Sequence, residues 1–254
     1  MSEETKVRQV SKRSMVFDQT KQRSKGLHKV IKTVFFPAYK YEKLRGSRVC
    51  GTLKFKSARQ RGKTIDAQLG KCVGDKNVKP PVKATNETKI ILTFIKEKGY
   101  YIEKSQQPVG FAPWRLATSL DLVLRPLPQN QNGADHRVVV EVKRGCLYRE
   151  CIVPGATSQR LEPSVSVCPL HMHQLQAVIG TELLRRTDPS IPIKSWVLYV
   201  DENGLTLVDD FAVQFSPTTE TALFATAQIC AGRKRKTVSS YTRNNNLKKF
   251  KKRK

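Results

Sequence analysis

The sequence predicts an α/β fold in which helices flank a central β-sheet. The first observation is a pair of apolar strand-like runs, residues 118–124 and 138–144, joined by a loop rich in Pro, Asn, Gln and Gly. The second is a set of stretches with apolar residues at helical spacing, at 57–73, 86–98 and 169–186. The third is the charge distribution, which separates a near-neutral middle from two basic ends.

The formal net charge of +26 is concentrated at the two ends of the chain. Residues 1–63 hold 18 Lys and Arg against four acidic residues, and residues 232–254 hold 11 Lys and Arg and no acidic residue. We therefore expect a basic N-terminal arm (1–45), one folded domain (46–231) and a basic C-terminal tail (232–254), with both extensions disordered. Such extensions neutralise phosphates, so DNA is the expected partner.

No apolar stretch reaches the roughly 18 residues of a membrane span, and the N-terminus lacks an apolar signal region. We therefore expect a soluble, intracellular protein without a membrane partner. Its six cysteines are then reduced thiols. The basic runs at 232–236 and 248–254 are typical of nuclear-import signals, which predicts the nucleus, and they could equally hold DNA.

The N-terminal half is expected to contain two helices. Residues 29–41 form the first apolar cluster, and Phe35 and Phe36 are the expected anchor on the folded domain. The first helix covers 57–73, with Ser57 as the N-cap. The second covers 86–98, with Asn86 as the N-cap and Gly99 just past its C-terminus.

The two central strands carry the candidate chemistry. Glu141 and Lys143 lie two residues apart, so their side chains share one face of the strand, and Val138, Val140 and Val142 occupy the other. Antiparallel pairing would bring Asp121 beside Glu141, with Leu120 and Leu122 on the face opposite Asp121. Burying a carboxylate and an ammonium on such apolar strands is costly unless they bind a metal, a ligand or each other.

Two carboxylates and a lysine suit a hard divalent cation that acts on phosphate. Mg²⁺ binds carboxylate and phosphate oxygens, and Mn²⁺ is expected to substitute for it. The lysine would orient the attacking water or neutralise the phosphate. A salt bridge on an edge strand would give the same Glu-x-Lys spacing without any chemistry.

The C-terminal half is expected to continue the alternation of strands and helices. A strand at 148–153 and a loop at 155–163 precede a helix that begins at Pro169 and ends near Arg186. A strand hairpin follows at 194–208, and a last helix begins at Pro217. No internal repeat is present in the sequence.

Three short motifs resemble the PD-(D/E)XK nuclease superfamily. Asp121 matches the D, and Glu141–Val142–Lys143 matches the (D/E)XK, with Gly145 as in the E-x-K-x-G of lambda-exonuclease-like and RecB-like members. Residues 61–69 resemble the first helix of the RecB-like nucleases, where Asp66 replaces the usual His or Glu. Residues 168–175 resemble their P-x-x-x-Q-L helix, although Val178 replaces the usual tyrosine.

The resemblance covers about residues 46–210 and implies a mixed central sheet, a restriction-endonuclease-like core and a magnesium-dependent deoxyribonuclease. It implies that Asp121 and Glu141 ligate the metal, with the carbonyl of Val142 as a further ligand. Asp66 would be an outer or direct ligand, or else a solvent-facing residue on an amphipathic helix. Lys143 would position the water and stabilise the transition-state charge.

The same resemblance implies that Gln174, and less directly His171, orients Lys143 or the phosphate. The candidate DNA contacts are Arg61, Lys63, Arg144, Arg160 and His171. Two other functions fit the sequence. One is a non-catalytic basic nucleic-acid-binding protein, either a degenerate nuclease fold or a packaging protein. The other is the nuclease subunit of a replication, recombination or transposition complex, with a protein partner.

Other chemistries find less support in the sequence. Cys146, Cys151, Cys168 and His171 could ligate zinc, but the C-x4-C spacing is not a tight knuckle, and cysteine is often a small buried apolar residue. The sequence contains no G-x-x-x-x-G-K-[ST] loop and no G-x-S-x-G motif. ATP-driven work and serine-hydrolase chemistry are therefore not expected.

Overall fold

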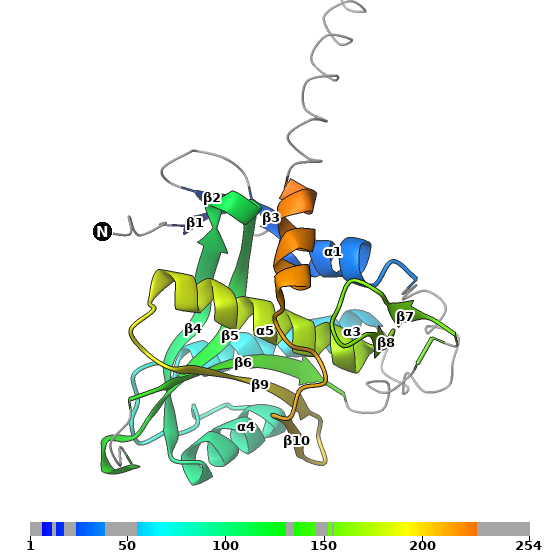
Figure 1. The fold of residues 1–254 in the computed structure, drawn as a ribbon. Coiled ribbons are helices and arrows are strands. Elements are labelled where there is room, and N and C mark those ends of the chain that lie inside the picture. The colour runs from blue at the N-terminus through cyan, green and yellow to red at the C-terminus, as the bar shows by residue number, and fades with distance from the viewer. Residues whose placement is uncertain are drawn as a thin grey trace, which may run out of the picture.

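A mixed β-sheet forms the centre of the molecule, which a computed structural model describes at residues 7–11, 14–17, 24–38, 55–130, 135–145, 152–153 and 155–227 (Figure 1). Its main strands are β4 (Tyr100–Phe111), β5 (Leu116–Pro126), β6 (Arg137–Arg144), β9 (Ile193–Val200) and β10 (Leu205–Val208). The order is β10-β9-β6-β5-β3, where β3 is Lys25–Gly26, and β4 pairs with β5 outside this path. β5 pairs antiparallel with β4 and β6, β6 pairs parallel with β9, and β9–β10 is an antiparallel hairpin. The prediction of an α/β fold with a mixed central sheet is confirmed.

Helices cover both faces of this sheet (Figure 1). On one face, α5 (Pro169–Thr187) packs through Leu175 and Ile179 against Leu120 and Val139. On the other face, α3 (Phe55–Gly70) and α4 (Asn86–Glu97) pack against the alternate residues of β6, Val138 and Val140. Apolar residues therefore cover both faces of β6, which explains why its sequence is almost entirely Val before Glu141.

The helix ends follow local capping chemistry. The N-cap of α4 is Thr85, whose hydroxyl accepts a hydrogen bond from the Thr88 N–H at 3.3 Å, so the prediction of Asn86 is off by one residue. Gly99 follows the helix with a φ of +78°, as predicted, because a left-handed residue there favours glycine. Cys168 caps α5, and its sulfur accepts from the His171 N–H.

The structure differs from the sequence-based expectation at the N-terminus. Strand β3 (Lys25–Gly26) pairs parallel with the start of β5, and α1 (Leu27–Val30) and the π-helical turn η1 (Ile31–Phe35) follow it directly. Phe35 and Phe36 are buried in the core beneath α5, as predicted for this anchor. Residues 24–38 therefore belong to the folded body, because their apolar side chains complete its core, and the expected arm at 1–45 does not include them.

The remaining described elements are short. A separate hairpin joins β1 (Val7–Ser11) to β2 (Ser14–Phe17), and another joins β7 (Thr157–Ser158) to β8 (Val165–Ser166). Two 3-10 turns, η2 (Ala112–Trp114) and η3 (Pro128–Asn130), flank β5. A helix over residues 217–227 ends the described chain, as predicted at its start. Predictions about residues 146–151 and 228–254, which include the C-terminal tail, lie outside the described residues.

The described helices include none that is long and apolar enough to cross a membrane.

Candidate functional site

The site begins where strands β5 and β6 stop pairing. Their register runs from Leu124 opposite Val138 to Leu122 opposite Val140, and it ends before Asp121 would meet Glu141. In place of a backbone partner, the Val142 N–H donates to Oδ2 of Asp121 at 3.0 Å. Because the N–H and C=O of a strand residue point to the same neighbour, the Val142 carbonyl faces the same opening.

The side chains of β5 also switch from one face of the sheet to the other at this point. Leu120 packs with α5 on one side of the sheet, whereas Leu122 and Leu124 pack with α3 and α4 on the other. The expectation that Leu120 and Leu122 share one face is therefore wrong. The side chains of β5 change faces at Asp121. Gln106 of β4 lies across from Asp121 and has a φ of +50°. Its Nε2 donates a hydrogen bond to Oδ1 of Asp121 at 3.3 Å. A non-glycine residue in this conformation is uncommon and concentrates at functional sites.

Glu141 is the most buried carboxyl group of the site, with 5% of its surface exposed. Burial raises its pKa to about 8, and the charge and hydrogen bond of Asp121 act in the same direction. Lys143 forms an ion pair with Oε1 of Glu141 and partly offsets these effects. Asp121 and Glu141 therefore lie side by side, as antiparallel pairing predicts.

A third carboxyl group approaches from helix α3. Asp66 is half-buried, and burial followed by the charge of Asp121 raises its pKa to about 6, while Lys143 acts in the opposite direction. The structure thus places Asp66 of α3 and Glu141 of β6 each near Asp121 of β5 and near Lys143. Raised pKa values of carboxyl groups beside another carboxylate, here those of Asp66 and Glu141, are typical of a site that gains from a bound cation.

The carboxylates are not yet arranged around an ion. Among the described residues, no three His, Cys, Asp or Glu side chains form a group ready to hold one metal. The donor set itself suits Mg²⁺, since it consists of carboxylate oxygens with a carbonyl facing the same opening.

Sequence reasoning missed two residues near Lys143, His173 of α5 and Tyr199 of β9. His173 of α5 shares a 2.9 Å hydrogen bond between its Nδ1 and the hydroxyl of Tyr199, which is fully buried on β9. Tyr199 stands in register with Lys143 across the β6–β9 pair. Burial and then the charges of Lys143, His28 and Lys32 lower the pKa of His173 well below its ordinary value.

The structure does not bring Gln174 to Lys143. Its side chain is buried, and Nε2 donates to the carbonyl of Asp210, just after β10, at 3.4 Å. Its Oε1 is also buried and has no hydrogen-bond partner among the described residues. The α5 residue that is coupled to Lys143 is the preceding one, His173. His171 lies at the start of the helix, where its Nδ1 donates to the Ser166 carbonyl at 2.7 Å.

The candidate DNA contacts are spread over several elements. Arg144 is largely buried beside Glu87, with Nε 3.2 Å from Oε1, so its guanidinium is committed to the protein. Arg61 is half exposed between Glu87 and Glu202, at 3.9 and 3.7 Å. Lys63 on α3 and Arg160 beyond β7 are exposed. Lys63 and Arg160 are the members of this set most accessible to a polyanion.

The candidate zinc ligands are only partly described. Cys146 and Cys151 lie outside the described residues. Cys168 and His171 are close together, but the sulfur and the imidazole ring each take part in a local hydrogen bond at the start of α5. This arrangement accounts for both residues as parts of a helix cap.

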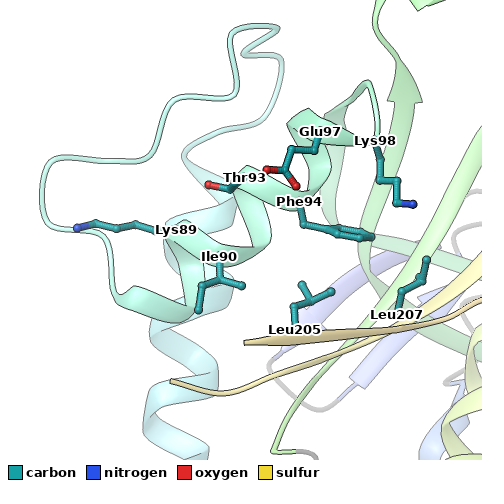
Figure 2. Close-up of a pocket in the computed structure, with 8 residues that line it drawn as sticks. All are labelled: Lys89, Ile90, Thr93, Phe94, Glu97, Lys98, Leu205 and Leu207. Atoms are coloured by element: carbon teal, nitrogen blue, oxygen red, sulfur yellow. The ribbon is translucent and has the colours of Figure 1, made fainter. Parts of the chain in front are cut away.

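A separate shallow hollow lies between α4 and β10 (Figure 2). Phe94 of α4 and Leu205 and Leu207 of β10 point toward one another across it, and Lys89 and Lys98 lie at its rim. It contains none of the candidate site residues. The carboxyl groups and Lys143 therefore remain the best-supported functional site.

Comparison with known proteins does not assign the chain to a family. Neither a protein-family model nor a curated protein sequence matches the chain.

Proposed function

We propose that this chain is a metal-dependent nuclease that hydrolyses phosphodiester bonds of DNA. The observation that carries the proposal is the meeting of Asp66, Asp121 and Glu141 beside Lys143 at the point where β5 and β6 separate. Burying three carboxyl groups together is costly unless a cation offsets their repulsion. Their oxygens and a lysine provide the groups that phosphoryl hydrolysis requires.

The order of elements also supports a PD-(D/E)XK nuclease. A helix with Asp66 precedes the strand with Asp121, the strand with the Glu-x-Lys motif follows, and helix α5 comes next. Gly145 fits the E-x-K-x-G pattern for a physical reason, because its φ of +88° favours glycine at the end of β6. Its N–H donates to the Val200 carbonyl at 2.9 Å and fixes that end of the strand.

In the proposed reaction Asp121 and Glu141 would hold Mg²⁺, with Asp66 and the Val142 carbonyl as further ligands. The ion, when bound, would lower the pKa of water and stabilise negative charge on the phosphate. Lys143 would leave its ion pair with Glu141 and donate to the attacking water or to a phosphate oxygen. Gln106 would hold Asp121 in place through its amide.

A non-catalytic nucleic-acid-binding protein is the second candidate. The intact Glu141–Lys143 ion pair favours it, because a salt bridge is also a complete structural role for both side chains. The net charge of +26 fits either function. Cleavage with metal separates the two.

The test is cleavage of linear and closed-circular DNA with Mg²⁺, comparing the intact chain with Lys143→Ala and Glu141→Gln. We expect the intact chain to cut and each variant to lose activity by about 100-fold or more, while DNA binding in EDTA is retained. The matched control is Lys194→Ala, which removes an exposed lysine from β9 at the position paired with Val138. Cleavage of linear DNA alone would indicate an exonuclease, and nicking of the circle an endonuclease.

Two results would contradict the proposal. The first is DNA binding by all four proteins without cleavage in Mg²⁺ or Mn²⁺. The second is equal activity in the Lys143→Ala and Lys194→Ala variants. Cleavage that requires an added protein would instead point to a subunit of a larger recombination or transposition complex.

A further inference from the structure

Strand β10 is an outer strand of the central sheet, and among the described strands it pairs only with β9. A hydrogen bond of 3.0 Å from the Asp201 N–H to the Gly204 carbonyl closes the β9–β10 hairpin. Counting from that pair, every second residue of β10 turns its N–H and C=O groups toward β9, whereas Leu205 and Leu207 turn theirs outward. Within the described chain these outward groups have no backbone partner.

The two outer strands of the sheet differ in how their edges are protected. Strand β4, which pairs with β5 alone among the described strands, has a register shift between Ile102 and Lys104, an exposed lysine at that shift, and Pro108. Bulges, lysines and prolines keep an edge strand from pairing with another chain. Strand β10 reads Leu-Thr-Leu-Val, without a charge or a proline, and its register with β9 is regular. Its edge is therefore open to pairing.

Apolar side chains lie beside this open edge. Leu205 and Leu207 face Ile90 and Phe94 of α4 across the shallow hollow (Figure 2). All four are only half-buried, although they pack against the core on this side of the sheet. We call these four residues, together with the outer side of β10, the β10 surface. It offers a partner both backbone hydrogen bonds and apolar contact that is favourable to remove from water.

Opposite charges mark the two ends of the β10 surface. Helix α4 and β10 start side by side, because Nδ2 of Asn86 donates to the Glu202 carbonyl in the turn before β10 at 3.0 Å. Lys89 therefore lies near the start of β10. Glu97 lies at the other end of the hollow, about 12 Å further along the helix. Both side chains are exposed.

We propose that the β10 surface joins two copies of this chain, with β10 pairing antiparallel to β10 of a second copy about a two-fold axis. Leu205 then pairs with Leu207 of the second copy, because both direct backbone groups outward, and Thr206 lies opposite its own copy. The two-fold axis also reverses the direction of α4, so Lys89 of each copy approaches Glu97 of the other. Hydrogen bonding, apolar contact and charge thus agree on one register. The dimer does not depend on the proposed nuclease function.

The first experiment measures self-association of the full-length chain by sedimentation equilibrium, from micromolar to submillimolar concentration. Lys89→Glu and Glu97→Lys should each weaken the dimer about tenfold, because each reversal brings like charges together at two symmetry-related positions. The double variant Lys89→Glu/Glu97→Lys should recover to within about threefold of the wild type, since it exchanges the two charges. Lys104→Glu is the matched control, because it makes the same charge change at an exposed lysine of β4, on the other outer strand.

The second experiment tests the register by disulfide formation. Thr206 and its copy form a non-hydrogen-bonded pair in the proposed dimer, with Cα atoms about 4.5 Å apart. This distance is within the range of a disulfide, so Thr206→Cys should yield a covalent dimer on oxidation with diamide. Asn203→Cys is the control, because this exposed residue lies in the turn before β10, away from the two-fold axis. Peptide mass spectrometry distinguishes the new disulfide from bonds of the six native cysteines.

The outcomes decide the proposal whether or not the chain cleaves DNA. Selective weakening by the two reversals, recovery in the double variant and preferential linkage at position 206 would support the β10 dimer. A chain that sediments as a monomer at every concentration would overturn it. So would a dimer that Lys89→Glu and Lys104→Glu weaken equally, or one in which linkage at position 203 matches linkage at position 206. Thermal unfolding of each variant checks that the fold is intact.

Discussion

At the scale of single residues, Glu141 links the stability of the fold to the proposed chemistry. Its pKa of about 8 and the pKa of about 6 for Asp66 lie above the ordinary values of 4.5 and 3.8. Both carboxyl groups therefore bind a proton more tightly in the folded chain than in the unfolded chain. These two groups therefore lower the free energy of unfolding as the pH rises from about 4 to about 8, whereas the lowered pKa values of His28 and His173 act in the opposite direction up to about pH 6.5.

This reasoning predicts that Glu141→Gln stabilises the metal-free protein at pH 9. The neutral amide removes a buried negative charge next to Asp121. It also removes the ion pair with Lys143, but that ion pair does not fully offset the cost of burying the charge. At pH 5 the glutamic acid is already protonated, so the two proteins should unfold at similar temperatures. Thermal unfolding in EDTA at both pH values measures the difference. An equal loss of stability at pH 5 and pH 9 would contradict the assignment of a raised pKa.

Single residues also show why the site is only partly predictable from sequence. Asp121, Glu141 and Lys143 stand on strands with a clear apolar pattern, so strand alternation alone places them together. Tyr199 joins them only through the register of β6 and β9, which are separated along the chain by α5. Sequence patterns do not determine the register of distant parallel strands. The sequence therefore gives no signal that links Tyr199 and His173 to Lys143.

At the scale of elements, α5 depends on a close approach to the sheet at Gly180. A Cβ atom there would lie 2.8 Å from Cδ2 of Leu120 and 3.9 Å from Cγ1 of Val139. Since both neighbours are buried core residues, they have little room to move aside. This contact sets the distance of α5 from β5 and β6, and hence the position of His173 at the Tyr199 hydroxyl.

The same substitution should therefore have opposite effects in two helices. Gly180→Ala is expected to destabilise the protein by about 1–3 kcal/mol through overpacking. Gly62→Ala in α3 is expected to stabilise it by about 0.5–1 kcal/mol, because alanine favours the helix and a Cβ there would meet no atom within 4 Å. Chemical denaturation of both variants tests the prediction. Stabilisation of both would show that α5 does not need the close approach.

Elements also differ in how clearly the sequence predicts them. Helix α5 has 19 residues with a continuous apolar stripe, and its predicted bounds agree closely with Pro169–Thr187. The α1–η1 segment is short, changes from α- to π-helical hydrogen bonding and is surrounded by basic residues. Its apolar cluster predicts an anchor on the body. The π-helical turn and the pairing of β3 with β5 depend on tertiary contacts that the local sequence does not encode.

At the scale of the whole molecule, basic composition and disorder do not coincide at the N-terminus. Residues 24–38 include several lysines, yet Leu27, Ile31 and Phe36 are buried in the core beneath α5. Lys29 is exposed and Lys32 is partly exposed, so one segment both completes the core and carries cations at the surface. A count of charges along the sequence cannot separate these two roles.

The two basic ends should therefore respond differently to removal. Deleting residues 1–38 is expected to lower the free energy of unfolding, because it removes part of the core. Replacing Phe36 by Ala is expected to lower it by about 3–5 kcal/mol, because the substitution opens a cavity under α5. Deleting residues 232–254 removes 11 Lys and Arg, so its main expected effect is weaker and less salt-dependent DNA binding. Thermal unfolding and DNA affinity, measured on the same proteins, test both effects. If Phe36→Ala unfolds at the wild-type temperature, the N-terminal segment does not contribute to the stability of the core.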